Sequence, residues 1–127
     1  ATLAGVAHKV LFLCIGNAVR SQMAEAYARK YGADVVEPYS AGLAPARAIS
    51  PLTRQALEER GVTLGEVFPK GLDALEGRKF DLIVNISGEP MWKTPTPVAE
   101  WKVRDPMGQK IEVYREAAQQ IESLVMR

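Results

Sequence analysis

A single cysteine, followed six residues later by an arginine, forms the most reactive pattern in this sequence of 127 residues. Cys14 ends an apolar run, and Arg20 follows it across the short segment IGNAV. A five-residue loop between a strand and a helix can direct its backbone N–H groups at one point, where the helix adds the positive end of its dipole. The pattern therefore favours a cradle for a tetrahedral oxyanion, with a cysteine thiolate at its base.

The residue types in this loop suit such a cradle. Gly16 allows close approach of the backbone, and Asn17 tolerates a positive φ. Arg20 can bind two oxygens of one anion with its planar guanidinium, and the Ser21 hydroxyl can donate to the sulfur. The predicted anion-binding residues are Ile15, Gly16, Asn17, Ala18, Val19, Arg20 and Ser21.

The simplest alternative is that Cys14 is only a small buried side chain, since free cysteine is among the most buried residue types. The apolar run before the cysteine, the Gly-Asn pair and the helical pattern after Ser21 together outweigh that alternative. The nucleotide-binding patterns G-x-G-x-x-G and G-x-x-x-x-G-K-[ST] are absent from the sequence. We therefore predict an oxyanion loop of another kind.

A thiolate that attacks phosphorus forms a phosphocysteine, and a carboxylic acid must then protonate the leaving oxygen and later activate water. Asp105 follows the last predicted strand and is therefore expected at the same end of the sheet as Cys14. An aspartate before a proline is otherwise a common turn opener. Asp105 is our candidate for the general acid.

The elements that must position these residues alternate between strands and helices. Apolar runs predict strands at residues 9–13, 34–40, 80–86 and 99–103. Pro38 cannot donate to a ladder and places the second strand at a sheet edge. Helical spacing and end signals predict helices between the loop and Gly32, between Ser50 and Gly61, at residues 72–75, and from about Gln109 to Val125.

This alternation predicts an α/β fold of three layers: a four-stranded parallel sheet in the order 2-1-3-4 with helices on both faces, similar to flavodoxin. In that order the ligand crevice lies beyond the carboxyl end of the first strand, where Cys14 is. The length of 127 residues fits one domain over residues 1–127.

Composition excludes several classes of function. The net charge of +1 leaves no basic stripe for nucleic acid, and the apolar runs are too short to span a bilayer. The N-terminal segment lacks the pattern of a signal peptide. We expect a cytoplasmic monomer that binds neither nucleic acid nor membrane.

One Cys and one His cannot build a structural zinc site, so no metal or cofactor is expected, and His8 is assigned no role.

Three segments occur in an informative order and spacing: CIGNAVRSQMAEA, Ser40-Ala41-Gly42 and Asp105-Pro106. Over essentially the whole chain, the sequence resembles the low-molecular-weight protein tyrosine phosphatases and the arsenate reductases that share their fold. The resemblance implies that Cys14 is the nucleophile, that Arg20 binds the transferred group and that Asp105 is the general acid. It also implies that three side chains hold the loop in shape: Asn17, Ser21 and Ser40.

From this resemblance we expect a phosphatase that hydrolyses phosphate monoesters of the phosphotyrosine type through a phosphocysteine. Its partner would be a phosphorylated protein or a small phosphate or arsenate oxyanion. Phosphatases of the family commonly have proline after the loop serine and aromatic residues after Asp-Pro. This chain has Gln22 and Met107-Gly108 there, which looks more like the reductase branch. Trp92, Trp101 and Tyr39 are interpreted as packing residues rather than as a wall for phosphotyrosine.

Two alternatives stay open. The thioredoxin-coupled arsenate reductases use two further cysteines near the segment that here reads NISGEPMW. With one cysteine, a reductase of this kind requires an external thiol, small or protein-borne, to resolve the Cys14 adduct. The second alternative is an oxyanion-binding module without catalysis, against which the presence of Cys14, Arg20 and Asp105 argues.

Overall fold

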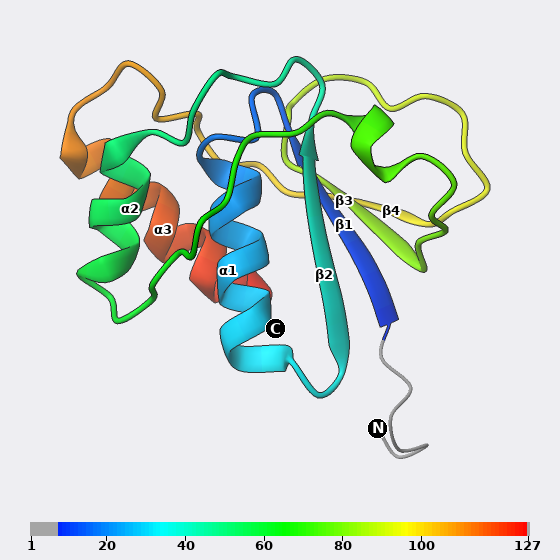
Figure 1. Cartoon of the computed structure of the whole chain (residues 1–127), viewed down its shortest axis with the longest axis horizontal. Helices are drawn as coiled ribbons and strands as arrows, with labels where there is room; N and C mark the ends of the chain where they lie inside the picture. Colours follow the sequence, from blue (N-terminus) through cyan, green and yellow to red (C-terminus); the bar gives the residue numbers. More distant parts are fainter. Residues whose placement is uncertain (1–7, 127) are drawn as a thin grey trace.

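The computed structural model describes residues 8–126, and its centre is a four-stranded parallel sheet (Figure 1). The strands are β1 (His8–Cys14), β2 (Val36–Gly42), β3 (Leu82–Asn85) and β4 (Val98–Glu100). They lie in the order β2-β1-β3-β4, which confirms the predicted order. Because β1 pairs with both β2 and β3, its carboxyl end opens at the middle of the sheet. Cys14 is the last residue of that strand.

The edge strand β2 contains Pro38, as its sequence predicts. Pro38 is paired in register with Val10, and the last pair of the two strands joins Cys14 to Gly42. The β1–β2 ladder therefore ends at the point where the cysteine loop leaves the sheet.

Strand β4 differs from the predicted range of residues 99–103. It begins one residue earlier and ends at Glu100, which is paired with Asn85. Strand β3 turns away after Asn85, at a turn in which Gly88 has a φ of 81°, so residues 101–103 lose their neighbouring strand. The carbonyl of Val103 instead accepts a hydrogen bond from a helix side chain, described below.

Three α-helices pack on one face of the sheet, and a single turn of 3₁₀-helix packs with loops on the other (Figure 1). The helices are α1 (Arg20–Gly32), α2 (Pro51–Glu58), η1 (Leu72–Leu75) and α3 (Ile111–Val125). The alternating residues of β1 separate the two cores: Val10 and Phe12 contact the helical layer, whereas Leu11 and Leu13 contact the layer of η1. The predicted helices on both faces are thus present, the second face with η1 alone.

Helices α2 and α3 are joined by side-chain contacts. Ser50 precedes α2 as predicted, but its hydroxyl donates to the Tyr114 hydroxyl at 3.0 Å rather than capping the helix. The guanidinium of Arg115 donates to both carboxylate oxygens of Glu59 at 2.8 Å, and these bonds lower the pKa of Glu59 to about 2. These contacts fix α2, whose Thr53 supports the cysteine loop.

No helix within residues 8–126 has the length and apolar character needed to cross a membrane. The expectation about a signal peptide falls largely on residues 1–7, which lie outside the described residues.

Candidate active site

The cysteine loop, residues 15–19, connects the buried end of β1 to the start of α1. Cys14 is 2% exposed, and Asn17 in the loop has a φ of 52°, the left-handed conformation that asparagine tolerates. Helix α1 begins at Arg20 without a side-chain cap. As at any helix start, the N–H groups of its first three residues have no intrahelical partner, and they add partial positive charge beside the cysteine.

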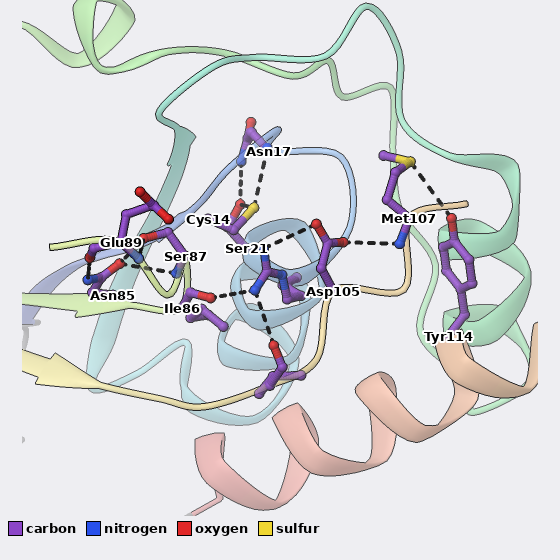
Figure 2. A network of polar contacts seen from close by, with 12 residues as sticks. Cys14, Asn17, Ser21, Asn85, Ile86, Ser87, Glu89, Asp105, Met107 and Tyr114 are labelled. Atoms are coloured by element: carbon purple, nitrogen blue, oxygen red, sulfur yellow. Dashed lines mark hydrogen bonds and ion pairs between the residues drawn. The ribbon is translucent and has the colours of Figure 1, made fainter. Parts of the chain in front are cut away.

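The sulfur of Cys14 is surrounded by hydrogen-bond donors (Figure 2). The Asn17 backbone N–H donates to Sγ at 3.3 Å, and the Ser21 hydroxyl lies 2.9 Å from Sγ. The Asn17 side-chain amide donates to Ser21 Oγ at 2.7 Å, which leaves the Ser21 proton directed at the sulfur. Both contacts are of the kind that a thiolate accepts.

The carbonyl groups of the loop are held by neighbouring segments. Three N–H groups of residues 43–46 donate to the carbonyls of residues 14–16 at N···O distances of 2.8 to 3.0 Å. The Thr53 hydroxyl donates to the Ala18 carbonyl at 2.9 Å. Among the described residues, no acceptor faces the N–H groups of Gly16, Ala18 and Val19. The loop therefore turns its carbonyls outward and keeps these donors free.

Gly42 permits this arrangement because the loop backbone passes directly over it. A Cβ atom at position 42 would lie 2.6 Å from the Ile15 carbonyl oxygen and 2.8 Å from the Asn17 nitrogen. Both atoms belong to the backbone, so neither can move aside without displacing the loop.

We expect Gly42→Ala to lower turnover of an oxyanion substrate about 10²-fold, the typical cost of displacing a reacting group by about 1 Å. Gly65→Ala is the matched control, because a Cβ there meets nothing within 4 Å. Steady-state kinetics of both variants, with circular dichroism to show that each is folded, check the expectation. Equal activity of the two variants would mean that close approach at Gly42 does not shape the loop.

Arg20 is 5% exposed and is held by two backbone carbonyls. Its Nη1 atom donates to Ile86 O at 2.6 Å and to Val103 O at 3.1 Å, which uses both Nη1 protons. Its Nε atom is buried without a hydrogen-bond partner in the described part of the chain. The guanidinium therefore keeps the edge formed by Nε and Nη2 for another acceptor.

Asp105 lies beside that edge. Its Oδ2 atom is 3.4 Å from Arg20 Nη2, and its Oδ1 atom accepts a hydrogen bond of 3.0 Å from the Met107 N–H. Its side chain is 44% exposed. Asp105 closes a small cavity of about 20 Å³, lined by Cys14, Gly16, Ala18, Val19, Arg20, Asp105 and Met107. That volume holds roughly one water molecule and is too small for a tetrahedral oxyanion.

A second layer of side chains holds Asn17. Its Oδ1 atom accepts hydrogen bonds from the Gln22 amide at 3.0 Å and from the Lys70 backbone N–H at 2.9 Å. Ser40, which the resemblance places in loop support, donates to Glu25 at 2.5 Å and accepts from Lys70 Nζ at 3.4 Å. Its link to the loop therefore runs through Lys70.

The structure places at one site five residues that the sequence predicts there: Cys14, Asn17, Arg20, Ser21 and Asp105. The sequence does not predict which residues hold the loop from outside. Those residues are Gly42, Leu43, Ala44, Ala46, Thr53 and Lys70. Of these residues, only Gly42 stands out in the sequence, because it belongs to the segment Ser40-Ala41-Gly42.

Residues 9–127 match the family model described as low molecular weight phosphotyrosine protein phosphatase. The chain belongs to this family. Glutaredoxin arsenate reductase of Synechocystis is 30% identical over 122 residues, 92% of either protein. A solved arsenate reductase in a phosphate-binding state has a TM-score of 0.83 at 28% identity, over 94% of both chains. An arginine phosphatase of Geobacillus stearothermophilus has a TM-score of 0.76 at 23% identity, over 94% of this chain and 88% of its own, and shares the fold.

This member of the phosphatase family has no aromatic wall among the residues that line the cavity. The exposed side chain next to Asp105-Pro106 is Met107, whose sulfur lies 4.0 Å from the Tyr114 hydroxyl. Trp101 packs against Phe12, with ring centroids 5.7 Å apart, as the packing interpretation predicts. Tyr39 packs against Phe80, with ring centroids 5.4 Å apart.

His8 begins β1, at the opposite end of the strand from Cys14. Within residues 8–126, no group of three or more His, Cys, Asp or Glu side chains is arranged to hold a metal ion.

Proposed function

We propose that this protein reduces arsenate to arsenite, with Cys14 as nucleophile and an external thiol as reductant. The proposal rests on one observation above all: the only cysteine of the chain lies at the base of a small cavity lined by Arg20 and Asp105. The 30% identical relative that is named as a glutaredoxin arsenate reductase supports this choice.

In the first step the Cys14 thiolate attacks arsenic(V). A sulfur–arsenic bond forms and one arsenic–oxygen bond breaks. Once the incoming anion displaces it from Arg20, the Asp105 carboxylate takes up a proton from solvent and passes it to that oxygen, which leaves as water. The Nε–Nη2 edge of Arg20 and the free N–H groups of the loop bind the remaining oxygens.

In the second step the thiolate of an external thiol attacks the Cys14 sulfur of the adduct. A disulfide bond forms, and the sulfur–arsenic bond breaks with its electron pair left on arsenic, which becomes arsenic(III). A second external thiol then attacks the mixed disulfide and releases the Cys14 thiolate. Overall, arsenate and two thiols give arsenite, one disulfide and water.

Hydrolysis of phosphate monoesters is the second candidate, and the position of Asp105 favours it. A carboxylate that protonates a leaving oxygen can afterwards activate water, which would release phosphate from a phosphocysteine without any thiol. The exposed Met107 at the cavity, in place of aromatic side chains, favours small substrates over phosphotyrosine in a protein.

The two functions separate in a pair of assays. The protein is incubated with arsenate and glutathione, and separately with p-nitrophenyl phosphate, and arsenite and p-nitrophenol are measured. Arsenite that forms only when the thiol is present supports the proposal. Hydrolysis of the aryl phosphate with no arsenite would replace it with a phosphatase, and the absence of both products would leave an oxyanion-binding module.

A further inference from the structure

The two carbonyls that hold Arg20 come from chain segments far apart in the sequence. Ile86 lies 66 residues after Arg20, and Val103 lies 83 residues after it. The two carbonyls accept both protons of Arg20 Nη1, so the Nε–Nη2 edge is the one that faces the cavity. The direction of Arg20 therefore depends on how these two segments are held relative to each other.

Sheet pairing holds them only in part: the Ile86 N–H donates to the Leu13 carbonyl of β1 at 2.7 Å, but no pair of β3 with β4 includes Ile86 or Val103. The last pair of β3 and β4 joins Asn85 to Glu100, and the Trp101 N–H donates to the Asn85 carbonyl at 3.0 Å. The carbonyls of Ile86 and Val103 both lie beyond that pair. The segment after β3 enters a turn at Gly88, where φ is 81°.

The side chain of Asn85, 1% exposed, connects the two segments at this point; Figure 2 shows its contacts with Ser87 and Glu89. Its Nδ2 atom donates to the Glu89 carbonyl at 2.8 Å and to Glu100 Oε1 at 3.1 Å. Its Oδ1 atom accepts hydrogen bonds from the Ser87 N–H at 3.1 Å and from the Ser87 hydroxyl at 2.6 Å. One buried amide thus shapes the turn that carries Ile86 and ties that turn to β4.

We infer that Asn85 is a positioning residue for Arg20, acting through the Ile86 and Val103 carbonyls. The inference rests on the proposed role of Arg20 in binding the oxyanion, and it applies to arsenate and phosphate alike. Asn85 touches neither the anion nor Cys14 in this account. Its effect is to keep the Nε–Nη2 edge aimed into the cavity.

Asn85→Asp tests this inference with little change in size. The substitution keeps the acceptor for Ser87, removes the N–H donors to Glu89 and Glu100, and places a carboxylate next to that of Glu100. We expect the Kd for inorganic phosphate, measured by calorimetry, to rise about tenfold, the change that corresponds to one misplaced hydrogen bond.

A second substitution distinguishes positioning from general damage. In the double variant Asn85→Asp/Glu100→Gln, the introduced amide can donate to the introduced carboxylate, and phosphate affinity is expected to return most of the way to wild type. Gln119→Glu, on the exposed face of α3, adds the same charge at a residue that contacts neither Arg20 nor Asn85 and should bind like wild type. Glu100→Ala removes an acceptor at an exposed position and should weaken binding in the same direction, by less.

Arg20→Lys is measured alongside these variants. Weak binding by Arg20→Lys together with wild-type affinity in Asn85→Asp and Glu100→Ala would overturn the inference and leave the oxyanion site intact. If Asn85→Asp loses affinity and the double variant does not recover it, the loss reflects damage to folding, and the inference is overturned as well. Wild-type affinity in Arg20→Lys would instead remove the oxyanion site on which the proposed function rests.

Discussion

Cys14→Ser is expected to abolish turnover while the binding of arsenate or phosphate remains measurable. A serine hydroxyl at neutral pH is a far weaker nucleophile than a thiolate, and it cannot form the disulfide that reduces arsenic. The donors that would hold the anion belong to the loop backbone and to Arg20, and they remain in the variant.

The measurement pairs two observables on the same preparation: arsenite release with glutathione, and the Kd for phosphate by calorimetry. Thr53→Ser is the matched control, because it keeps a hydroxyl for the Ala18 carbonyl at a buried position next to the loop. Turnover by Cys14→Ser at a rate near wild type would remove Cys14 from the chemistry. Loss of both turnover and binding would assign the sulfur a structural role in the cradle.

Asp105→Asn is expected to slow the first chemical step by about 10²–10⁴-fold, the usual contribution of general acid catalysis. The carboxylate lies at the cavity next to Arg20 and can reach an oxygen that leaves opposite Cys14. The same substitution removes the negative charge that competes with an anion for Arg20. We therefore expect weaker catalysis together with equal or tighter binding of phosphate, a combination that damage to the site would not give.

A series of aryl phosphates tests the proton transfer itself, if the phosphatase assay shows activity. A leaving group with a very acidic phenol needs little protonation and should be affected least in single turnovers, and one with a weakly acidic phenol should be affected most. A uniform loss over the series would mean that Asp105 acts only through the turn it forms with Met107.

The features that the sequence predicts are the local ones. Strand β1 contains a continuous apolar run from Val10 to Cys14, and Gly16 and Asn17 have backbone preferences of their own. The spacing after Ser21 is helical, so the loop between strand and helix follows from neighbouring residues. The strand order follows from Pro38 at an edge and from the rules for parallel connections.

The features that the sequence does not predict depend on contacts over long separations. Arg20 donates to the carbonyls of Ile86 and Val103, and any residue type at those positions offers the same carbonyl. The support of the loop by residues 43–46 is likewise made by backbone groups. Strand β4 ends early because β3 turns away, an event that no pattern within residues 99–103 reports.

The chemical state of Cys14 during turnover tests directly whether this residue is the nucleophile that an external thiol resolves. The wild-type protein is mixed with arsenate and glutathione, quenched in acid within one turnover, and digested for mass spectrometry of the peptide that contains Cys14. We expect a mixed disulfide between Cys14 and glutathione that forms within one turnover only when arsenate is present. Arsenite release with Cys14 free at all times, or a mixed disulfide that forms equally fast without arsenate, would contradict it.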